Sequence, residues 1–295
     1  MKLVGLIYNP VAGDTAFRHR VDQVIATLQT GGILVIPYRT TAPGDAAIGA
    51  EKLIAQGCTA LLVAGGDGTI HQVVNTLVQK QVDIPLGVFP AGTANDFAAQ
   101  LGLPKDPVAV CNLVLENQVR RVDLGQVNDR VFVNVASAGA LTDVSYNIDL
   151  GLKNTLGKLG YYLKGLEQLP RLRPIEMEIQ MDNHIISGPI SLLLVLNGGW
   201  AGGFQLVPNA NMQDGLLDVL IVKACQWTEF IGLFLKLFRG EHINDPKVSF
   251  YRTDSLTVKS TTTIETDVDG EQGPHFPWRV GVLPGKLPIF APAKV

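Results

Sequence analysis

The sequence predicts an α/β domain with a parallel sheet, followed by a domain built mainly from antiparallel strands. Three observations predict this. The first third alternates short apolar runs with helix-length segments, the pattern changes near residue 125, and strand-like runs separated by turn residues follow. The 295 residues also exceed the size at which one hydrophobic core usually stops growing. We therefore expect two domains, residues 1–125 and 126–295.

In the first domain the expected strands and helices alternate along the chain. The expected strands are Leu3–Tyr8, Leu34–Tyr38, Ala60–Ala64 and Pro85–Phe89. The expected helices are Phe17–Gln29, Asp45–Gln56 and His71–Lys80. Such alternation is typical of βαβ units, in which helices cover both faces of a parallel sheet.

In the second domain Gly, Asn, Asp or Pro turns separate many of the strand-like runs, which predicts an antiparallel sandwich. The expected strands are Val131–Val135, Ile175–Met181, Ile190–Leu196, Leu217–Val222, Ser255–Lys259 and Thr263–Val268. Two helices, near Lys158–Gln168 and Thr228–Phe238, interrupt them. A last strand at about residues 285–293 could return to the first domain.

The composition excludes two classes of protein. Hydrophobic residues make up 46% and charged residues 17%, with 31 glycines, which is typical of an ordered globular protein and not of a disordered one. The net charge of -3 gives no basic field for binding a phosphate backbone, so we expect no nucleic-acid partner.

The apolar runs and the cysteines predict a cytoplasmic protein without a transmembrane segment. The longest runs, Leu192–Leu196 and Phe230–Leu235, are far shorter than the roughly 20 residues that cross a bilayer. Tyr8-Asn9-Pro10 ends the first apolar stretch before a secretory signal could form. The 3 cysteines are too few and too scattered for a disulfide framework.

Three glycine-containing loops follow expected strands of the first domain. They are Asn9-Pro10-Val11-Ala12-Gly13, Gly65-Gly66-Asp67-Gly68-Thr69 and Pro90-Ala91-Gly92-Thr93-Ala94-Asn95-Asp96. Glycine with short polar residues before a helix lets backbone N–H groups approach phosphate oxygens. One such loop is ordinary turn chemistry, whereas three favour a nucleotide site. Neither the P-loop motif nor G-x-G-x-x-G occurs in the required context, so P-loop NTPases and dinucleotide dehydrogenases are not supported.

Together these loops resemble the catalytic domain shared by diacylglycerol kinases, sphingosine and ceramide kinases and bacterial lipid kinases. Three motifs of the second domain resemble those of bacterial members of this family. They are Leu206-Val207-Pro208-Asn209-Ala210, Asp214-Gly215 and Asp269-Gly270-Glu271. The Gly-Gly-Asp-Gly element alone also occurs in NAD kinases and phosphofructokinase-like proteins, so the specificity lies in the whole set. The resemblance implies a first domain with a fold like that of phosphofructokinase and NAD kinase. It also implies that the nucleotide site lies in the cleft between the domains.

The resemblance also implies ATP and Mg²⁺ as cofactors and assigns the site residues. ATP would be surrounded by Asn9, Pro10, Gly13, Thr40, Gly65, Gly66, Asp67, Gly68, Thr69, Ile70, His71, Thr93, Asn95 and Asp96. Glu271 would be the general base, and Asp67 a second catalytic residue. A second, mainly structural metal site would use Asp214 and backbone oxygens of Asn211 and Leu216. The carboxylates of Asp67, Asp96 and Asp123 would meet near the phosphates and hold magnesium through waters.

These assignments agree with the needs of phosphoryl transfer, which are positioning, a metal that neutralises charge, and a base that orients the hydroxyl. Carboxylates can supply the last two, since Mg²⁺ prefers oxygen ligands. Gly270 permits a tight turn that could aim Glu271 into a cleft. The alternative is an ordinary turn with a solvated carboxylate.

Local structure offers alternatives elsewhere too. Asp123 could form a surface ion pair, and Asp214 could belong to an ordinary Asp-Gly turn. Either Thr40 or Thr41 could cap the helix that starts near Asp45.

The chain departs from the family at several positions. Relatives commonly have Asn-Glu where this chain has His71-Gln72, and His71 could contact the phosphates or face solvent at the helix start. Some bacterial members carry basic residues where this chain has Asp14 and Ala99. Any interdomain or lipid-facing salt bridges made there are missing here.

We expect the acceptor to be diacylglycerol at the cytoplasmic membrane surface, giving phosphatidic acid. Another lipid (phosphatidylglycerol or a sphingoid base), an NAD kinase-like activity and a non-catalytic nucleotide-binding regulator are the alternatives. The element Gly92-Thr93-x-Asn95-Asp96-Phe97 counts against an NAD kinase, and the presence of Asp67, Asp96 and Glu271 counts against a regulator. The resemblance also admits a homodimer.

Two segments could meet the membrane. A basic cluster interleaved with Leu and Tyr could bind anionic headgroups or form a solvated helix flank; it comprises Lys153, Lys158, Lys164, Arg171 and Arg173. The segment Trp227–Phe238 is more apolar than a surface helix, and we expect it to pack on a sheet, with insertion at an interface as the alternative.

Overall fold

The computed structural model of the chain describes residues 2–13, 15–139, 173–182 and 184–293. These fall into two units, Met1–Val122 with Gly285–Val295, and Asp123–Pro284. The predicted helix Lys158–Gln168, the basic cluster apart from Arg173, and Asp14 lie outside the described residues.

Unit 1 is built on a parallel sheet with the order β4-β3-β1-β2. Its strands are β1 (Lys2–Tyr8), β2 (Ile33–Arg39), β3 (Ala60–Gly65) and β4 (Leu86–Pro90). Every residue of β3 is buried, as is typical of a central strand with helices on both faces. The parallel α/β domain predicted from the sequence is confirmed.

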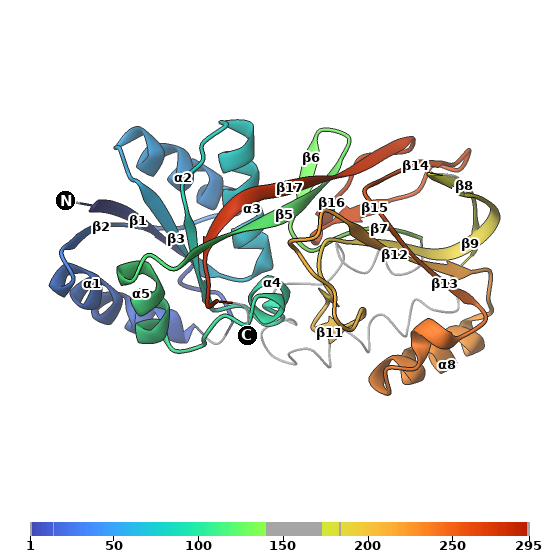
Figure 1. Ribbon diagram of the computed structural model, residues 1–295, viewed down its shortest axis with the longest axis horizontal. Coiled ribbons are helices and arrows are strands. Elements are labelled where there is room, and N and C mark those ends of the chain that lie inside the picture. Colours follow the sequence, from blue (N-terminus) through green and yellow to red (C-terminus); the bar gives the residue numbers. More distant parts are fainter. Residues whose placement is uncertain (1, 14, 140–172, 183, 294–295) are drawn as a thin grey trace. The chain divides into compact units, whose positions relative to one another are not determined.

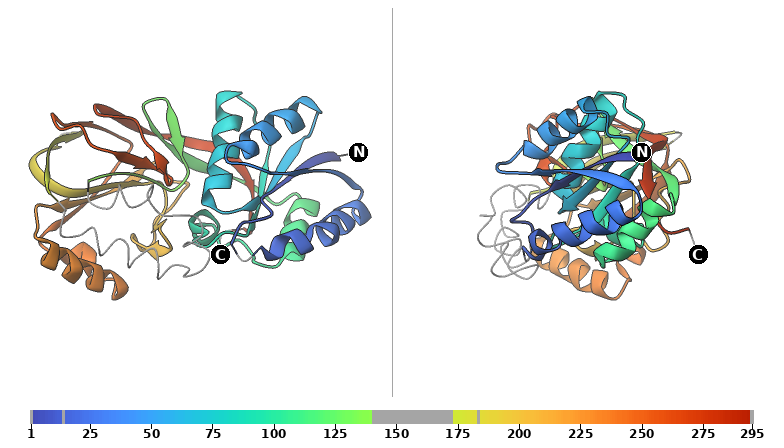
Figure 2. Two further views of the ribbon diagram at one scale, coloured as in Figure 1. Left: turned by 180° about the vertical axis from the view of Figure 1, so that it is seen from behind. Right: turned by 90° about the vertical axis from the view of Figure 1, so that its left-hand side faces the viewer.

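Helices cover both faces of this sheet (Figures 1 and 2). One face carries α1 (Val21–Thr30) and α5 (Pro107–Leu115), and the other carries α2 (Asp45–Ala55) and α3 (Asp67–Gln79). The short helix α4 (Asp96–Gln100) follows β4. The predicted helix Phe17–Gln29 is divided into a 3-10 turn, η1 (Ala16–His19), and α1.

Helix α3 begins at Asp67 rather than at His71 as predicted. Gly66 is its N-cap, and its carbonyl accepts hydrogen bonds from Thr69 N–H (3.0 Å) and Ile70 N–H (3.2 Å). The motif Asp67-Gly68-Thr69 is therefore the first helical turn. The sequence reasoning missed this because the turn has no apolar periodicity.

Unit 2 is an antiparallel, β-rich unit, as predicted. Its main strands are β6 (Arg130–Phe132), β7 (Val135–Gly139), β8 (Ile175–Met181), β9 (His184–Leu196), β12 (Leu217–Lys223), β13 (Val248–Thr253), β14 (Ser255–Lys259), β15 (Thr266–Val268) and β16 (Glu271–Gln272). A small hairpin consists of β10 (Trp200–Ala201) and β11 (Phe204–Gln205). The largest side chains of its core are Trp278 and Phe132, both fully buried.

The predicted strand Val131–Val135 is interrupted, since β6 ends at Phe132 and β7 begins at Val135. The strand breaks because the N–H groups of Val133, Asn134 and Val135 all bond to the carboxylate of Asp269.

Two strands begin in one unit and end in the other, namely β5 (Val119–Val127) and β17 (Trp278–Phe290). The first part of β17 pairs antiparallel with β14, and Ile289 near its end pairs in parallel with Leu86 of β4. Ala291 N–H then donates to the carbonyl of Gln118 (3.1 Å). The final strand therefore completes the sheet of unit 1.

Helix α8 (Trp227–Phe238) packs one face on the sheet of unit 2, where Phe230 and Leu233 join a core cluster with Leu192 and Val222. Its other apolar face is open to solvent, because Trp227, Leu235 and Phe238 are 48%, 59% and 62% exposed. In the part of the chain that the structure describes, no helix combines the length and apolar character needed to span a membrane.

Candidate active site

The three glycine-containing loops meet at the carboxyl ends of β1, β3 and β4. Asn9 N–H donates to the carbonyl of Ala64 (2.9 Å), and Ala91 N–H donates to that of Gly65 (3.1 Å). The first and third loops are thus hydrogen-bonded to the end of β3, from which the second loop starts, and the parallel register brings all three together.

The loops touch through backbone atoms at glycine positions. A Cβ at Gly92 would lie 2.4 Å from the Cα of Gly66, and a Cβ at Gly13 would lie 2.3 Å from the carbonyl oxygen of Ala91. Gly13 also has a φ of +54°, in the left-handed region that favours glycine. Only glycine allows these approaches, so the three loops form one continuous backbone surface.

Two asparagines shape this surface from within. The Oδ1 of Asn95 accepts from Gly92 N–H (2.7 Å) while its Nδ2 donates to the carbonyl of the same residue (2.8 Å). The Oδ1 of Asn9 accepts from Val11 N–H (3.0 Å). Of the other predicted loop contacts, Thr93 is exposed and Pro10 is buried. The asparagines therefore have a structural role, and their contact with ATP stays a prediction.

Asp67 and Asp96 begin neighbouring helices, α3 and α4, and the structure brings them close. Phe97 N–H, next to Asp96 in the chain, donates to Asp67 Oδ1 (3.2 Å). Asp96 is 5% exposed, whereas Asp67 is half-buried. Two carboxylates without His or Cys fit Mg²⁺, which keeps several waters and needs only one or two protein carboxylates beside substrate phosphates. Within the described ranges no three His, Cys, Asp or Glu side chains form a metal-binding group.

Thr40 lies beside the first loop but caps no helix. Its N–H donates to the carbonyl of Tyr8 (3.0 Å), and its hydroxyl donates to the same oxygen (3.4 Å). Gly44 is the N-cap of α2, so the predicted threonine cap is wrong. Thr41 instead donates from its hydroxyl and its N–H to Asp45, and these hydrogen bonds lower the pKa of Asp45.

Two further predicted ATP residues have buried side chains. His71 is 6% exposed and Ile70 is 1% exposed. The interpretation that His71 faces solvent is therefore wrong. Asn75 Nδ2, one helical turn later, donates to the carbonyl of His71 (3.0 Å). The N–H of Ile70 donates to the carbonyl of Gly66 (3.2 Å), and contact of Ile70 with ATP stays a prediction.

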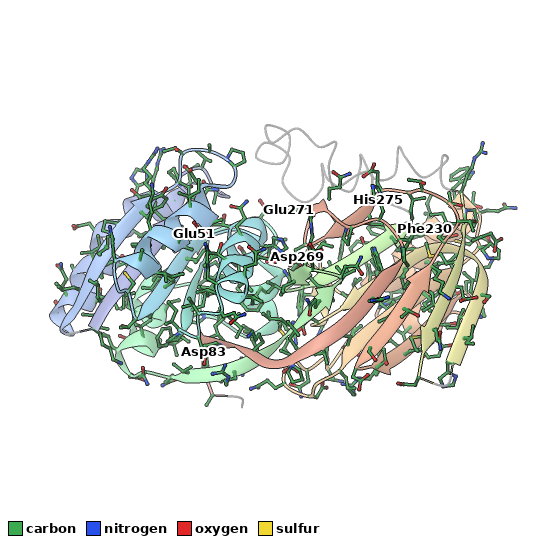
Figure 3. The ribbon with its side chains drawn as sticks, turned by 90° about the horizontal axis from the view of Figure 1, so that it is seen from above. Glu51, Asp83, Phe230, Asp269, Glu271 and His275 are labelled. Carbon is green, nitrogen blue, oxygen red and sulfur yellow. The ribbon has the colours of Figure 1, made fainter. Side chains whose placement is uncertain are left out.

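Glu271 begins β16, which pairs with β15 through a two-residue turn. The turn residues Asp269 and Gly270 have φ values of +52° and +86°, the signature of a type I′ hairpin, and Val268 lies opposite Glu271. The predicted tight turn is present. Glu271 itself is half-buried, so the alternative of a solvated Glu271 carboxylate stays open, whereas the Asp269 residue is 9% exposed. Figure 3 shows Asp269 and Glu271 next to each other on this hairpin.

The structure also brings Asp123 to the predicted second metal site. Asp123 is 3% exposed, so a surface ion pair is excluded. Its Oδ2 accepts from Gly215 N–H (2.9 Å), and its N–H donates to the carbonyl of Met212 (2.7 Å). Asp123 therefore holds the turn at residues 212–215.

The surroundings of Asp214 do not fit an open metal site. Its Oδ1 accepts from Leu216 N–H (3.0 Å), and its Oδ2 forms a hydrogen-bonded ion pair with Arg252. Arg252 also reaches Asp218, whose pKa is raised to about 6 by desolvation, against the opposing effect of Arg252. Each oxygen of Asp214 already accepts a hydrogen bond, and the metal site predicted at Asn211, Asp214 and Leu216 stays a prediction.

The sequence reasoning missed Asn197. This residue is 2% exposed, and its Nδ2 donates both to the carbonyl of Asp123 (2.8 Å) and to that of Val133 (3.0 Å). The only signal in the sequence was an Asn-Gly-Gly motif directly after the apolar run of β9.

Comparison with known proteins gives matches to both parts of the chain. Residues 4–127 match the family described as "Diacylglycerol kinase catalytic domain", and residues 134–291 match the "YegS C-terminal NAD kinase beta sandwich-like domain".

Similar proteins match over nearly the full length. The chain is 38% identical over 289 residues to "Diacylglycerol kinase" of Bacillus subtilis (strain 168), covering 97% of this chain and 93% of the relative. It is 35% identical over 292 residues to a Staphylococcus saprophyticus protein of the same name, covering 99% and 96%. A crystal structure of a diacylglycerol kinase from Bacillus anthracis str. Sterne superposes with a TM-score of 0.81 at 26% identity, covering 99% and 97%.

Proposed function

The chain belongs to the diacylglycerol kinase family, and from this membership we propose that it transfers the γ-phosphate of ATP to the free hydroxyl of diacylglycerol, producing phosphatidic acid. Membership makes it a lipid kinase that uses ATP. The observation that carries the proposal is the meeting of three loops, in which Gly13 lies against Ala91 and Gly66 against Gly92.

The nucleotide phosphates would bind where these loops meet the start of α3. Backbone N–H groups there can donate to phosphate oxygens, and a helix N-terminus carries partial positive charge. Gly68 and Thr69 of the first helical turn would lie nearest to the phosphates. The contact of Gly66, directly before this turn, with Gly92 of the third loop supports the predicted ATP residues as one group.

Asp67 and Asp96 would hold Mg²⁺ through waters, as their shared position at two helix starts suggests. The ion would neutralise charge on the β- and γ-phosphates during transfer. The two carboxylates would orient that ion beside the γ-phosphate, which is the group transferred.

Glu271 would act as the general base. As the bond between the γ-phosphorus and its bridging oxygen to ADP breaks, a new bond forms between phosphorus and the lipid oxygen. The hydroxyl proton then passes to the Glu271 carboxylate.

The acceptor lies in a membrane, so we propose a cytoplasmic enzyme that works peripherally at the membrane surface. Family resemblance is what supports this location and a homodimer.

A lipid panel tests the proposal. Purified protein is incubated with MgATP and mixed micelles of diacylglycerol, phosphatidylglycerol or a sphingoid base, and the radiolabelled lipid product is separated. We expect phosphatidic acid to form, and to form faster than the phosphorylated product of either other lipid. Product only from another lipid would reassign the substrate, and no lipid product at all would refute the proposal.

The variant Glu271→Gln tests the base. It keeps the size of the side chain but cannot accept the proton, so we expect turnover to fall by about 100-fold or more while the Kd for ATP changes less than twofold. Turnover near that of the wild type would show that Glu271 is not the base.

A further inference from the structure

We propose that Asp269 is a positioning residue for Glu271, and that Asn197 completes a buried polar network linking the Glu271 hairpin to Asp123. The proposal rests on the proposed role of Glu271 as the base. It adds Asp269, which would affect the rate of transfer only by holding Glu271 in place.

Asp269 fixes its hairpin to the break between β6 and β7. Its Oδ2 accepts from Val133 N–H (2.6 Å), and its Oδ1 accepts from Asn134 N–H (2.8 Å) and Val135 N–H (2.9 Å). Its own N–H donates to the carbonyl of Val135 (2.9 Å). Hydrogen bonds to a carboxylate are among the strongest in proteins, so these three, together with the backbone bond to Val135, make this turn rigid.

The position of Glu271 depends on that turn because Glu271 is the first residue after it, whereas the contacts of β16 with the side chains of Arg130 and Glu265 are made by Gln272. The strand has two residues, Glu271 and Gln272, and lies at the edge of the sheet with β15 as its strand partner. Glu271 is two residues after Asp269. A change at the Asp269 anchor therefore moves the Glu271 backbone directly.

Asn197 holds the same segment through its carbonyls. Its N–H donates to the carbonyl of Asn134 (2.9 Å), and its Nδ2 bridges the carbonyls of Val133 and Asp123. Asp269 thus takes the N–H groups of residues 133–135, while Asn197 takes two of their carbonyls. One network connects the Glu271 hairpin to Asp123, which holds the turn at residues 212–215.

This network carries a free-energy cost that an ordinary sheet would avoid. An uninterrupted strand through residues 133–135 would satisfy the same N–H groups with neutral carbonyls, whereas here a carboxylate has to be buried. A positional role accounts for that choice, because an error of about 1 Å in a reacting group can lower the rate by about 100-fold.

Two substitutions of Asp269 test the proposal. Asp269→Gly keeps the left-handed turn but removes the three accepted hydrogen bonds, and Asp269→Asn keeps shape and turn but presents an amide donor to at least one N–H group. We expect kcat to fall about 100-fold in Asp269→Gly and about 10-fold in Asp269→Asn, with the KM for ATP within twofold of the wild type. Hydrogen exchange at residues 266–273 should quicken in both.

The matched control is Asp182→Gly. Asp182 also has a positive φ (+43°), between β8 and β9, and lies outside the network. We expect its kcat to equal that of the wild type. If Asp269→Gly does not fold, Asp269→Asn carries the comparison, since the isosteric side chain retains at least one accepted bond.

The outcomes separate this inference from the proposed function. A wild-type protein that phosphorylates no lipid refutes the function. An active wild type whose kcat is unchanged in the Asp269 variants overturns the positioning role. A fall in kcat with a proportional rise in the KM for ATP also overturns it, because the loss would then be general unfolding of the site.

Discussion

At the scale of single residues, Gly68 and Gly232 form a natural pair. Both lie inside helices, α3 and α8, and a Cβ added to either would meet no atom within 4 Å. They differ only in place, since Gly68 lies in the first turn of α3 and Gly232 lies in unit 2. Their substitution therefore separates helix stability from ligand contact.

We expect both Gly68→Ala and Gly232→Ala to raise the thermal midpoint slightly, because alanine is favoured over glycine in helices by up to about 1 kcal/mol. Only Gly68→Ala should weaken ATP binding, by about 10-fold or more, since its methyl group would occupy space where the phosphates approach. Isothermal titration calorimetry with ATP measures this. Equal ATP affinity in the two variants would place the phosphates away from the start of α3.

The sequence indicated which loops meet at the carboxyl ends of the strands but not which side chains are buried. The glycine loops were predictable because a glycine-rich turn after a strand is a local signal. The burial of Asp269 was not, since the N–H groups it binds lie 134 to 136 residues earlier in the chain. The same holds for Asp123, whose Oδ2 is bound by the N–H of Gly215.

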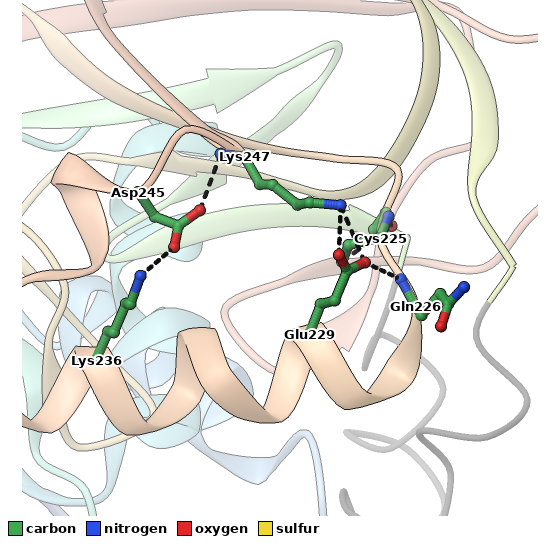
Figure 4. Close-up of polar contacts among 7 residues, drawn as sticks. Cys225, Gln226, Glu229, Lys236, Asp245 and Lys247 are labelled. Atoms are coloured by element: carbon green, nitrogen blue, oxygen red, sulfur yellow. Dashed lines mark hydrogen bonds and ion pairs between the residues drawn. The ribbon is translucent and has the colours of Figure 1, made fainter.

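At the scale of elements, α8 is held by two ion pairs and a capping hydrogen bond (Figure 4). Glu229 accepts from Gln226 N–H (2.7 Å) at the helix start and pairs with Lys247 (2.9 Å). Lys236 pairs with Asp245 on the following loop (2.6 Å). These contacts fix the helix ends, while Phe230 and Leu233 fix its buried face.

The pH dependence of stability should show how much the Glu229 carboxylate contributes to the fold. Its hydrogen bond to Lys247, and then that to Gln226 N–H, lower its pKa below the ordinary 4.5. Since the folded pKa is lowered, the carboxylate stabilises the fold above pH 4.5, and this contribution is lost as the pH falls through the folded value.

We therefore expect Glu229→Gln to melt at a lower temperature than the wild type at pH 7, by a few degrees at most, with the difference disappearing towards pH 3. Circular dichroism melts across this range measure it. A difference that stays constant with pH would mean that packing, not charge, was changed.

Elements were predictable where the local pattern was strong. Strands such as Ile175–Met181 and Ser255–Lys259 have the predicted bounds, because apolar alternation and flanking turns define them. Helix α5 was missed although Asp106 caps it through Ala109 N–H (3.1 Å) and Pro107 opens it, which are recognised start signals. The division between β6 and β7 was not predictable, since a distant carboxylate causes it.

At the scale of the whole molecule, the last residues belong to the first unit. Leu287, Ile289 and Phe290 are 2%, 0% and 3% exposed. At about 1.5–3 kcal/mol for each buried side chain, they contribute about 5–9 kcal/mol, which is comparable to the total stability of a domain.

We therefore expect a chain that ends at Gly285 to have unit 1 unfolded. Limited proteolysis should then cut within residues 2–122, and ATP binding should be lost. A chain that ends at Ala293 is the control and should resist the protease like the full-length protein. Protease resistance of unit 1 in the shorter chain would contradict the assignment of the last strand to its sheet.

The pairing of β17 with β4 also determines when the sheet of unit 1 can be completed during synthesis. Ile289 pairs with Leu86, yet about 200 residues separate β4 from this partner in the chain. At 5–20 residues per second, roughly 10–40 s of translation pass between the two strands. Residues 2–122 of unit 1 thus leave the ribosome before the end of β17 that pairs with them, and one edge of their sheet stays incomplete until residue 289 has been made.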